Sequence, residues 1–353
     1  MVSIALLGFG TVGSGVAEVL TENKELIKRR TGLDVDIKYI LDLREFPEHP
    51  LGNRIVHDMS VILNDPEVSI VVEMMGGVHP AYDFSIAAIK AGKNVVTSNK
   101  AVVAAYGPEL LREAAERGLR YLFEASVGGG IPIIRPLTDL SAENDITEIV
   151  GILNGTTNYI LTAMKETGVT FEEALKNAQA LGYAEADPTA DVDGFDTCRK
   201  ICILSAVAFG NLVSYEDVKT VGIRSVTLDD INNAEAEDGS VKLIARALKV
   251  GEKVMITVEP YVVTRSNPLY SISDVFNGIL VKGQVCGELM FYGKGAGKLP
   301  TAGAVVSDIL DIASRGNDQP PQSIWTNDAS LLISTLPESV ADTTINELGR
   351  PLN

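Results

Sequence analysis

The chain opens with Val2-Ser3-Ile4-Ala5-Leu6-Leu7, runs directly into Gly8-Phe9-Gly10-Thr11-Val12-Gly13, and continues in a helical pattern to Ile27. An apolar strand, a Gly-x-Gly-x-x-Gly turn and a helix in this order are typical of a dinucleotide-binding fold. Gly8 permits the tight turn, Gly10 lets a pyrophosphate approach, and Gly13 lets the helix pack on the strand. A plain glycine turn is the alternative, but this context favours an N-terminal α/β domain of the Rossmann type. The predicted coenzyme contacts in this turn are Gly8, Phe9, Gly10, Thr11, Val12 and Gly13, where helix N–H groups meet the phosphates.

Three later segments extend the predicted sheet. Residues 36–42 form a strand that ends in an acid, residues 69–77 form a strand that ends in two glycines, and residues 94–100 form another. Ligands of an open parallel sheet bind beyond the carboxyl ends of its strands. Lys100 has an alternative interpretation as a solvated lysine at a strand end. We expect the coenzyme to contact Gly76, Gly77, Thr97, Ser98 and Lys100.

The choice of coenzyme depends on the end of the second strand. Asp42 could hydrogen-bond the adenosine ribose of NAD, and its charge would disfavour the 2′-phosphate of NADP. Arg44 follows two residues later and could instead bind that phosphate. The sequence therefore leaves both NAD and NADP open at this position.

Composition excludes several classes of protein. The chain has 353 residues, is 46% hydrophobic and carries a formal net charge of −17, so it is long enough for two domains with their own cores. The negative charge argues against nucleic acid and against anionic membrane surfaces as partners. No apolar run approaches the roughly 20 residues that span a bilayer. The first lysine is Lys24, so a signal peptide with a basic start is not indicated, and we expect a cytoplasmic protein.

The scarce histidines and cysteines also restrict the chemistry. His49, His57 and His79 are the only histidines, so proton transfer elsewhere must use carboxylates, lysines, tyrosines or water. Cys198 and Cys202 have helical spacing on an apolar stripe, which indicates reduced core cysteines rather than a disulfide framework. Schemes with a late catalytic histidine or a zinc site are therefore disfavoured.

Carboxylates crowd into the segment Gly182-Tyr183-Ala184-Glu185-Ala186-Asp187-Pro188 and continue through Asp191 to Asp196 and Lys200. Such a segment suits binding an ammonium group and moving a proton. Asp196 and Lys200 stand at i,i+4 spacing, and the alternative is a surface ion pair worth only about 0.2–0.5 kcal/mol. However, residues 201–209 are apolar nearly all round, which predicts a buried helix. A charged pair at the start of a buried helix favours a functional role.

A second domain is predicted after residue 133. Predicted strands of a mixed sheet cover residues 147–153, 254–258, 261–264, 278–282 and 289–292, and predicted helices follow Thr170, Gly194 and Thr301. The Thr170 to Glu173 segment forms a capping box. We predict a dinucleotide-binding domain over residues 1–133 plus about 300–315, an α+β substrate and dimerisation domain over 134–299, and a C-terminal tail over 316–353.

The motifs between Val2 and about Ile312 resemble those of homoserine dehydrogenases, and they occur in the same order along the chain. The most specific is Gly-Tyr-x-Glu-x-Asp-Pro followed by Asp and Asp-x-x-x-Lys, at residues 182–200. Residues 97–100, 124–132 and 293–301 match further family motifs. The resemblance implies a homodimeric oxidoreductase that interconverts L-homoserine and L-aspartate 4-semialdehyde with NAD(P), in threonine and methionine biosynthesis. Since only about 40 residues follow the last predicted helix, we expect a short form without a C-terminal ACT domain.

The resemblance and the residues together give candidate roles. Family members often carry an arginine where this chain has Leu41, which favours NAD over NADP. The catalytic candidates are Lys200, which relays the hydroxyl proton, Asp196, which holds it, and Lys100, which polarises the oxygen. The substrate-binding candidates are Glu185, Asp191, Thr156 and Tyr183. Gly295 and Gly297 belong to a loop that covers the nicotinamide.

The resemblance also implies a monovalent cation site. The carbonyl groups of Glu124, Val127, Gly129 and Ile131 would hold Na⁺ or K⁺, since ligation by oxygen alone suits a hard ion. A plain crossover between two domains is the alternative interpretation of this glycine-rich segment.

Two rival functions remain. An aspartate-semialdehyde dehydrogenase would need an acylated cysteine, and no cysteine here follows an exposed turn. A non-catalytic, NAD-binding regulatory protein would keep the glycine turn but could lose Lys200. The presence of both Lys100 and Lys200 favours the enzyme.

Overall fold

The structure of the protein is a computed structural model. It describes residues 1–315, 322–335 and 348–352. The chain forms two compact units. The first contains residues 1–132 and 296–325, and the second contains residues 133–295 and 326–353. The short segments that join them therefore lie near Pro132, Gly295 and Trp325.

The first unit is built on a six-stranded sheet in the order β3-β2-β1-β4-β5-β6. Every neighbouring pair in this sheet runs parallel. The strands are β1 (Val2–Leu7), β2 (Val35–Leu41), β3 (Ile55–Val56), β4 (Val68–Glu73), β5 (Asn94–Thr97) and β6 (Tyr121–Leu122). This is the strand order of the doubly wound dinucleotide-binding fold, so the predicted Rossmann-type sheet is confirmed.

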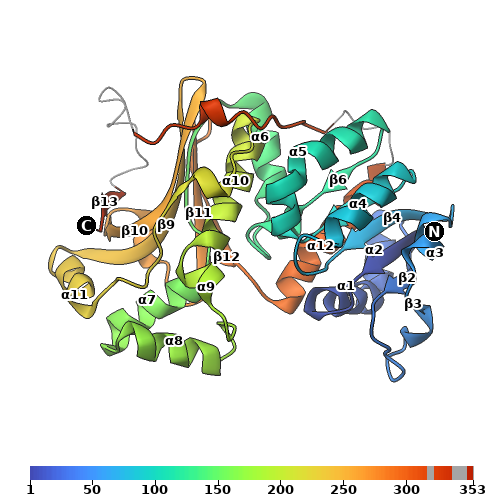
Figure 1. The fold of residues 1–353 in the computed structure, drawn as a ribbon, viewed down its shortest axis with the longest axis horizontal. Coiled ribbons are helices and arrows are strands. Elements are labelled where there is room, and N and C mark those ends of the chain that lie inside the picture. Colours follow the sequence, from blue (N-terminus) through green and yellow to red (C-terminus); the bar gives the residue numbers. More distant parts are fainter. Residues whose placement is uncertain (316–321, 336–347, 353) are drawn as a thin grey trace. The chain divides into compact units, whose positions relative to one another are not determined.

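Helices pack on this sheet (Figure 1), and their apolar side chains form the core of the unit together with those of the strands. They are α1 (Thr11–Glu22), α2 (Lys24–Thr31), α3 (Met59–Leu63), α4 (Ala81–Lys90), α5 (Lys100–Glu116) and α12 (Lys298–Arg315), with the 3-10 turns η1 (Gly52–Arg54) and η2 (Glu124–Ser126). α1 and α12 pack on each other, and Val16 and Ile309 share one core cluster with Leu6 and Val72 of the sheet. The last helix of the unit thus packs against its first.

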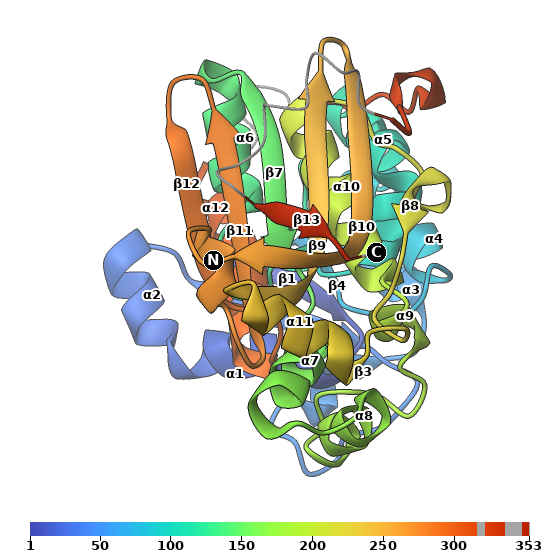
Figure 2. The ribbon, with the colours of Figure 1, turned by 90° about the vertical axis from the view of Figure 1, so that its left-hand side faces the viewer.

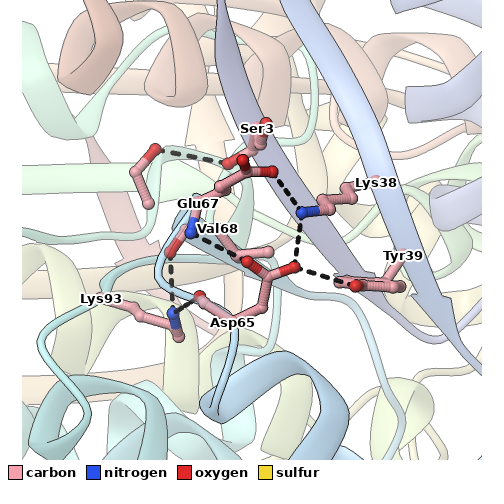
Figure 3. Close-up of polar contacts among 8 residues, drawn as sticks. Ser3, Lys38, Tyr39, Asp65, Glu67, Val68 and Lys93 are labelled. Carbon is pink, nitrogen blue, oxygen red and sulfur yellow. Dashed lines mark hydrogen bonds and ion pairs between the residues drawn. The ribbon is translucent and has the colours of Figure 1, made fainter.

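A polar cluster fixes the amino-terminal end of β4 (Figure 3). Lys38 of β2 forms ion pairs with Asp65 (2.6 Å) and Glu67 (2.5 Å), and the Tyr39 hydroxyl donates to Asp65 (2.9 Å). Lys93, just before β5, donates to the backbone carbonyl groups of Asp65 and Val68. The hydrogen bonds from Lys38 hold the pKa of Asp65 down at about 2. The cluster lies at the end of β4 opposite to its carboxyl end, where ligands of such sheets bind.

The second unit is built on a mixed sheet in the order β12-β11-β7-β9-β10-β13 (Figure 2). The strands are β7 (Ile146–Ile152), β9 (Gly239–Val250), β10 (Lys253–Thr264), β11 (Phe276–Gly283), β12 (Gly287–Lys294) and β13 (Gly349–Pro351). Neighbours in this path are antiparallel, whereas β8 (Lys219–Thr220) joins β10 in parallel. The predicted mixed sheet of the second domain is therefore confirmed.

The helices of this unit are α6 (Ile134–Glu143), α7 (Gly155–Thr167), α8 (Phe171–Ala180), α9 (Thr189–Val192), α10 (Phe195–Phe209) and α11 (Leu228–Ala236), with short 3-10 turns at η3 (Tyr215–Asp217), η4 (Pro268–Ser271) and η5 (Ala329–Leu331). The Thr170 capping box at the start of α8 is present as predicted. α10 is largely buried and packs on β7, β9 and β10, as its apolar sequence indicates.

Three predicted elements differ from the structure. The segment at 94–100 is a strand only to Thr97, and Lys100 is the first residue of α5 because Asn99 caps that helix. The two predicted strands around Pro260 form one continuous strand, β10, because it pairs with β9 along its whole length. β9 was not predicted, since Lys242 and Arg246 interrupt its apolar pattern. Both of these basic residues are buried.

The predicted C-terminal tail begins with residues 316–321, which lie outside the described residues. Within the described part of the chain, every helix is too short or too polar to cross a bilayer.

Candidate active site

The glycine turn after β1 combines a left-handed backbone position with a close approach of helix to strand. Gly8 has a φ of 90°, which favours glycine, and a Cβ on Gly13 would lie 2.1 Å from the Gly8 carbonyl oxygen. A Cβ on Gly10 would meet no atom within 4 Å. Gly8 and Gly13 are therefore required by the fold itself, whereas Gly10 borders open space that a phosphate group can enter.

Asp42 and Arg44 are bound to each other at the end of β2. The Asp42 carboxylate accepts four hydrogen bonds, from Phe9 N (2.7 Å), Arg44 N (3.0 Å), Arg44 Nε (2.9 Å) and Arg44 Nη2 (2.9 Å). The Arg44 guanidinium in particular holds the pKa of Asp42 far below its usual range. The Asp42 side chain is 7% exposed and that of Arg44 is 61% exposed. Arg44 can therefore move away more easily than Asp42.

A hydrogen-bond network joins the carboxyl ends of β4 and β5. Glu73 is fully buried and accepts from the Thr97 hydroxyl (2.6 Å) and from Met75 N (2.7 Å). The Asn99 carboxamide donates to the carbonyl groups of Met75 (3.2 Å) and Gly77 (2.7 Å), and its oxygen caps α5. Burial raises the pKa of Glu73. The network fixes the backbone around Gly76, Gly77 and Lys100, and the Thr97 side chain is occupied within it.

Neither Glu73 nor Asn99 was among the predicted site residues. An acid inside the apolar run of residues 69–77 is the signal that could have indicated Glu73, because buried acids need partners. The cap position before the predicted lysine is the corresponding signal for Asn99.

The predicted cation segment is a tight, buried turn. Gly128 and Gly129 have φ values of 79° and 56°, and the side chains of Val127 and Ile131 are buried. Two carbonyl groups of this turn, those of Phe123 and Gly128, accept backbone hydrogen bonds within it. Neither belongs to the predicted ligand set. Among the described residues, no group of histidine, cysteine, aspartate and glutamate side chains could hold a metal ion. Backbone carbonyl oxygens are ligands that suit a hard ion better than a transition metal.

The two predicted loop glycines lie in different units. Gly295 ends the second unit, where a Cβ would lie 2.0 Å from Asn277 Nδ2. Gly297 belongs to the first unit and has a φ of 127°, just before α12 begins. Both positions therefore require glycine for local reasons.

Lys200 and Asp196 form the predicted pair at the start of α10. Lys200 Nζ lies 2.7 Å from Asp196 Oδ2 and donates to the Leu153 carbonyl oxygen at 2.8 Å. Lys200 is 8% exposed and Asp196 is 4% exposed. The alternative of a solvated surface pair is therefore wrong. A buried ammonium next to a carboxylate can give and receive a proton without a histidine.

Asn154 connects this pair to the acidic segment. It follows β7, and its side-chain nitrogen donates to Asp191 Oδ1 (2.7 Å) and to Asp196 Oδ2 (2.9 Å). Asp191, Asp196 and Lys200 thus lie close together, and Asn154 is a member of this cluster that the sequence did not indicate. Its only sequence signal is a capping residue between a strand and a helix.

The other substrate candidates lie on the same segment. The Thr156 hydroxyl donates to the Tyr183 carbonyl oxygen at 2.6 Å, and the Tyr183 ring packs edge-on against Tyr159 at 5.1 Å. Glu185 is exposed, and its backbone carbonyl accepts from Gln179. The start of α7 and the turn after α8 therefore meet. Lys100 belongs to the first unit.

Comparison with known proteins finds matches over most of the chain. Two family models match the chain, one described as "Homoserine dehydrogenase, NAD binding domain" over residues 8–124 and one described as "Homoserine dehydrogenase" over residues 132–310. Together they cover the regions that contain nearly all of the predicted site residues.

Individual relatives show the same likeness. A homoserine dehydrogenase of Synechocystis is 46% identical over 316 residues, which are 88% of this chain and 73% of that protein. A crystal structure of a homoserine dehydrogenase from Thiobacillus denitrificans has a TM-score of 0.87 at 37% identity, with 95% of this chain and 79% of that chain covered. A hyperthermophilic archaeal homoserine dehydrogenase in complex with NADPH has a TM-score of 0.76 at 28% identity, with 88% and 97% covered.

Proposed function

This chain belongs to the homoserine dehydrogenase family, whose members are NAD(P)-dependent oxidoreductases, and from that premise we propose that it interconverts L-homoserine and L-aspartate 4-semialdehyde. The observation that carries the proposal is the buried Lys200–Asp196 pair, with Lys200 Nζ 2.7 Å from the carboxylate. It lies beside the acidic segment in a protein whose first unit has a dinucleotide-binding fold. We place the reaction in the pathway from aspartate to threonine and methionine.

The oxidation of an alcohol breaks a C–H and an O–H bond. The bound nicotinamide supplies an acceptor for the hydride. Lys200 accepts the hydroxyl proton in this direction and returns it to the carbonyl oxygen in the other. Asp196 and the Leu153 carbonyl accept two of the N–H bonds of Lys200, which leaves the third position on its nitrogen for the reacting oxygen. In the neutral amine that position is the lone pair that accepts the proton, and in the ammonium it is the N–H that returns it. Lys100 is proposed to polarise the reacting oxygen.

The amino acid itself is proposed to bind on the acidic segment. Asp191 and Glu185 provide carboxylates for the ammonium and hydroxyl ends of homoserine, and Tyr183 lines the same turn. The Thr156 hydroxyl already donates a hydrogen bond to the Tyr183 backbone carbonyl at 2.6 Å. Thr156 would therefore reach the substrate carboxylate through its backbone N–H in the first turn of α7, where such groups bind anions.

One spectrophotometric assay tests both activity and coenzyme preference. With L-homoserine and each coenzyme at equal ionic strength, we expect reduction of the coenzyme and a kcat/KM for NAD at least about tenfold above that for NADP, or ~1.4 kcal/mol. The reason is that Asp42 is the buried partner of the Asp42–Arg44 pair and would face the ribose. No reduction of either coenzyme would reject the proposed function.

Two variants separate the roles of Asp42 and Arg44. Arg44→Ala frees the Asp42 carboxylate and should leave turnover with NAD nearly unchanged, whereas Asp42→Asn should weaken the discrimination against NADP. If Arg44→Ala instead removes a dominant activity with NADP, then Arg44 rather than Asp42 governs the pocket, and the preference for NAD is wrong.

A monovalent cation is proposed to bind the carbonyl groups of Glu124, Val127, Gly129 and Ile131. The support is the buried turn with Gly128 and Gly129 at positive φ. Dialysis into a tetramethylammonium buffer should lower the homoserine activity or the melting temperature, and K⁺ or Na⁺ at equal ionic strength should restore it. Equal values with all three cations would contradict this site.

We also propose a homodimer. The support is the mixed sheet of the second unit, whose edge strand β12 exposes the apolar side chains of Met290 and Tyr292. Edge strands of this kind are surfaces on which a second chain can assemble.

A further inference from the structure

The orientation of the Asn154 carboxamide is determined by its surroundings. Asn154 is 4% exposed, and its oxygen accepts from Thr157 N at 2.9 Å as the N-cap of α7. A backbone N–H can bond only to the oxygen of a carboxamide, so the nitrogen must point the other way. It does so, toward Asp191 Oδ1 at 2.7 Å and Asp196 Oδ2 at 2.9 Å. Both N–H bonds of the side chain therefore end on carboxylates.

This arrangement holds two like charges on one neutral donor. Asp191 belongs to α9 and Asp196 to α10, and the Asn154 side chain bonds to both. Hydrogen bonds to an ionised acceptor are among the stronger ones in proteins. The carboxamide thus fixes the two carboxylates relative to each other without adding charge.

The same segment also fixes Lys200. Asp196 Oδ2 is shared, since it accepts from Asn154 and lies 2.7 Å from Lys200 Nζ. The neighbouring residue, Leu153, accepts a hydrogen bond from Lys200 Nζ through its carbonyl oxygen. The β7–α7 junction therefore contacts both members of the ion pair, one through its backbone and the other through a side chain.

We infer that Asn154 is a positioning residue for the proposed dehydrogenase reaction, an inference that rests on the function proposed above. It holds the proton relay, Lys200 with Asp196, at a fixed distance from Asp191, the carboxylate assigned to the substrate. Misplacement of reacting groups by as little as 1 Å can cost about a hundredfold in rate. The cap on α7 could be provided by serine, threonine or aspartate as well as asparagine, but only a carboxamide donates to both carboxylates.

Asn154→Asp is the decisive variant. It keeps the size and the cap oxygen, removes both donors, and brings a third negative charge next to Asp191 and Asp196. The added charge favours the protonated form of Lys200, which must lose a proton before it can accept one from homoserine. We expect kcat for homoserine oxidation to fall at least about tenfold. The pH at half-maximal rate should rise by about one unit. The melting temperature should change by only a few degrees.

Asn267→Asp is the matched control. Asn267 is another buried N-cap asparagine of the second unit and accepts from Leu269 N at 3.0 Å at the start of η4. This variant should leave the pH midpoint of homoserine oxidation unchanged. If Asn154→Asp proves unfolded, Asn154→Ser keeps a cap oxygen, adds no charge and lacks the two carboxamide N–H donors, and its kcat should still fall at least about tenfold.

A readout without turnover separates this inference from the proposed function. Reductive methylation of Lys200, followed by peptide mass spectrometry across pH, should show a higher midpoint in Asn154→Asp than in the wild type and in Asn267→Asp. If the wild type does not oxidise homoserine but this shift appears, the proposed function fails, while the coupling of position 154 to Lys200 is still shown. In Asn154→Asp, the pH midpoint of Lys200 labelling and the pH profile of homoserine oxidation could instead both stay at their wild-type values. That result would show that Asn154 only caps α7.

Discussion

Replacing Lys200 by alanine is expected to lower kcat for homoserine oxidation by at least about a hundredfold, the usual contribution of a general acid–base group. The side chain is 8% exposed and paired with Asp196 at 2.7 Å. Among the described residues, no histidine beyond His79 is available to replace it. Because the coenzyme binds to the other unit, the dissociation constant of the coenzyme should change little. Stopped-flow measurement of the first turnover, together with a fluorescence titration of the reduced coenzyme, tests both expectations.

A buried lysine elsewhere in the same unit gives the control. Lys242 is 3% exposed and lies 3.4 Å from Asn158 Oδ1, and burial lowers its pKa to about 8. Lys242→Met removes a buried ammonium without touching α10, so it should cost stability and leave kcat within a small factor. Similar losses of kcat in both variants would attribute the effect to a disturbed fold, and most of the turnover surviving in Lys200→Ala would remove Lys200 from the mechanism.

Sequence alone could predict the parts of the site that are local in the chain. The glycine turn of residues 8–13 and the Asp196–Lys200 pair each lie within a few residues, so spacing decides their geometry. The fold class and the family resemblance are confirmed for the same reason, since motif order follows the order of the elements.

The contacts that join distant segments could not be predicted. Asn154 bonds to residues that follow it by 37 and 42 positions, and Glu73 bonds to Thr97, 24 positions later. Nothing in the local pattern of an Asn-Gly dipeptide after a strand distinguishes a turn from a cap that also binds carboxylates. Such partners are set by tertiary structure.

Strand β9 shows the same limit within the sheet. Its Arg246 is 5% exposed and pairs with Glu148 of β7 at 2.6 Å, and Glu148 is fully buried. Basic residues normally indicate a solvated face, so the strand was missed. A buried pair of this kind becomes visible only when β7 and β9 are known to be neighbours.

Two substitutions three residues apart in the glycine turn should both weaken NAD binding but differ in their effect on the stability of the protein without coenzyme. A Cβ on Gly13 would lie 2.1 Å from the Gly8 carbonyl oxygen, so Gly13→Ala forces α1 away from β1. Overpacking of this kind costs ~1–3 kcal/mol, and it should lower the melting temperature by several degrees even without coenzyme. Displacement of the helix start should also raise the dissociation constant of NAD by at least about tenfold, or ~1.4 kcal/mol.

Gly10→Ala is the matched partner and should spare the fold. Gly10 has a φ of −81°, which any residue adopts, and a Cβ there meets nothing within 4 Å. The melting temperature without coenzyme should therefore stay at the wild-type value. The methyl group would nevertheless occupy the space that we assign to the pyrophosphate, so the dissociation constant of NAD, measured by calorimetry, should rise at least about tenfold. Unchanged NAD binding in Gly10→Ala would mean that the phosphates do not approach the chain at this turn, because the open space beside Gly10 is the feature that admits them.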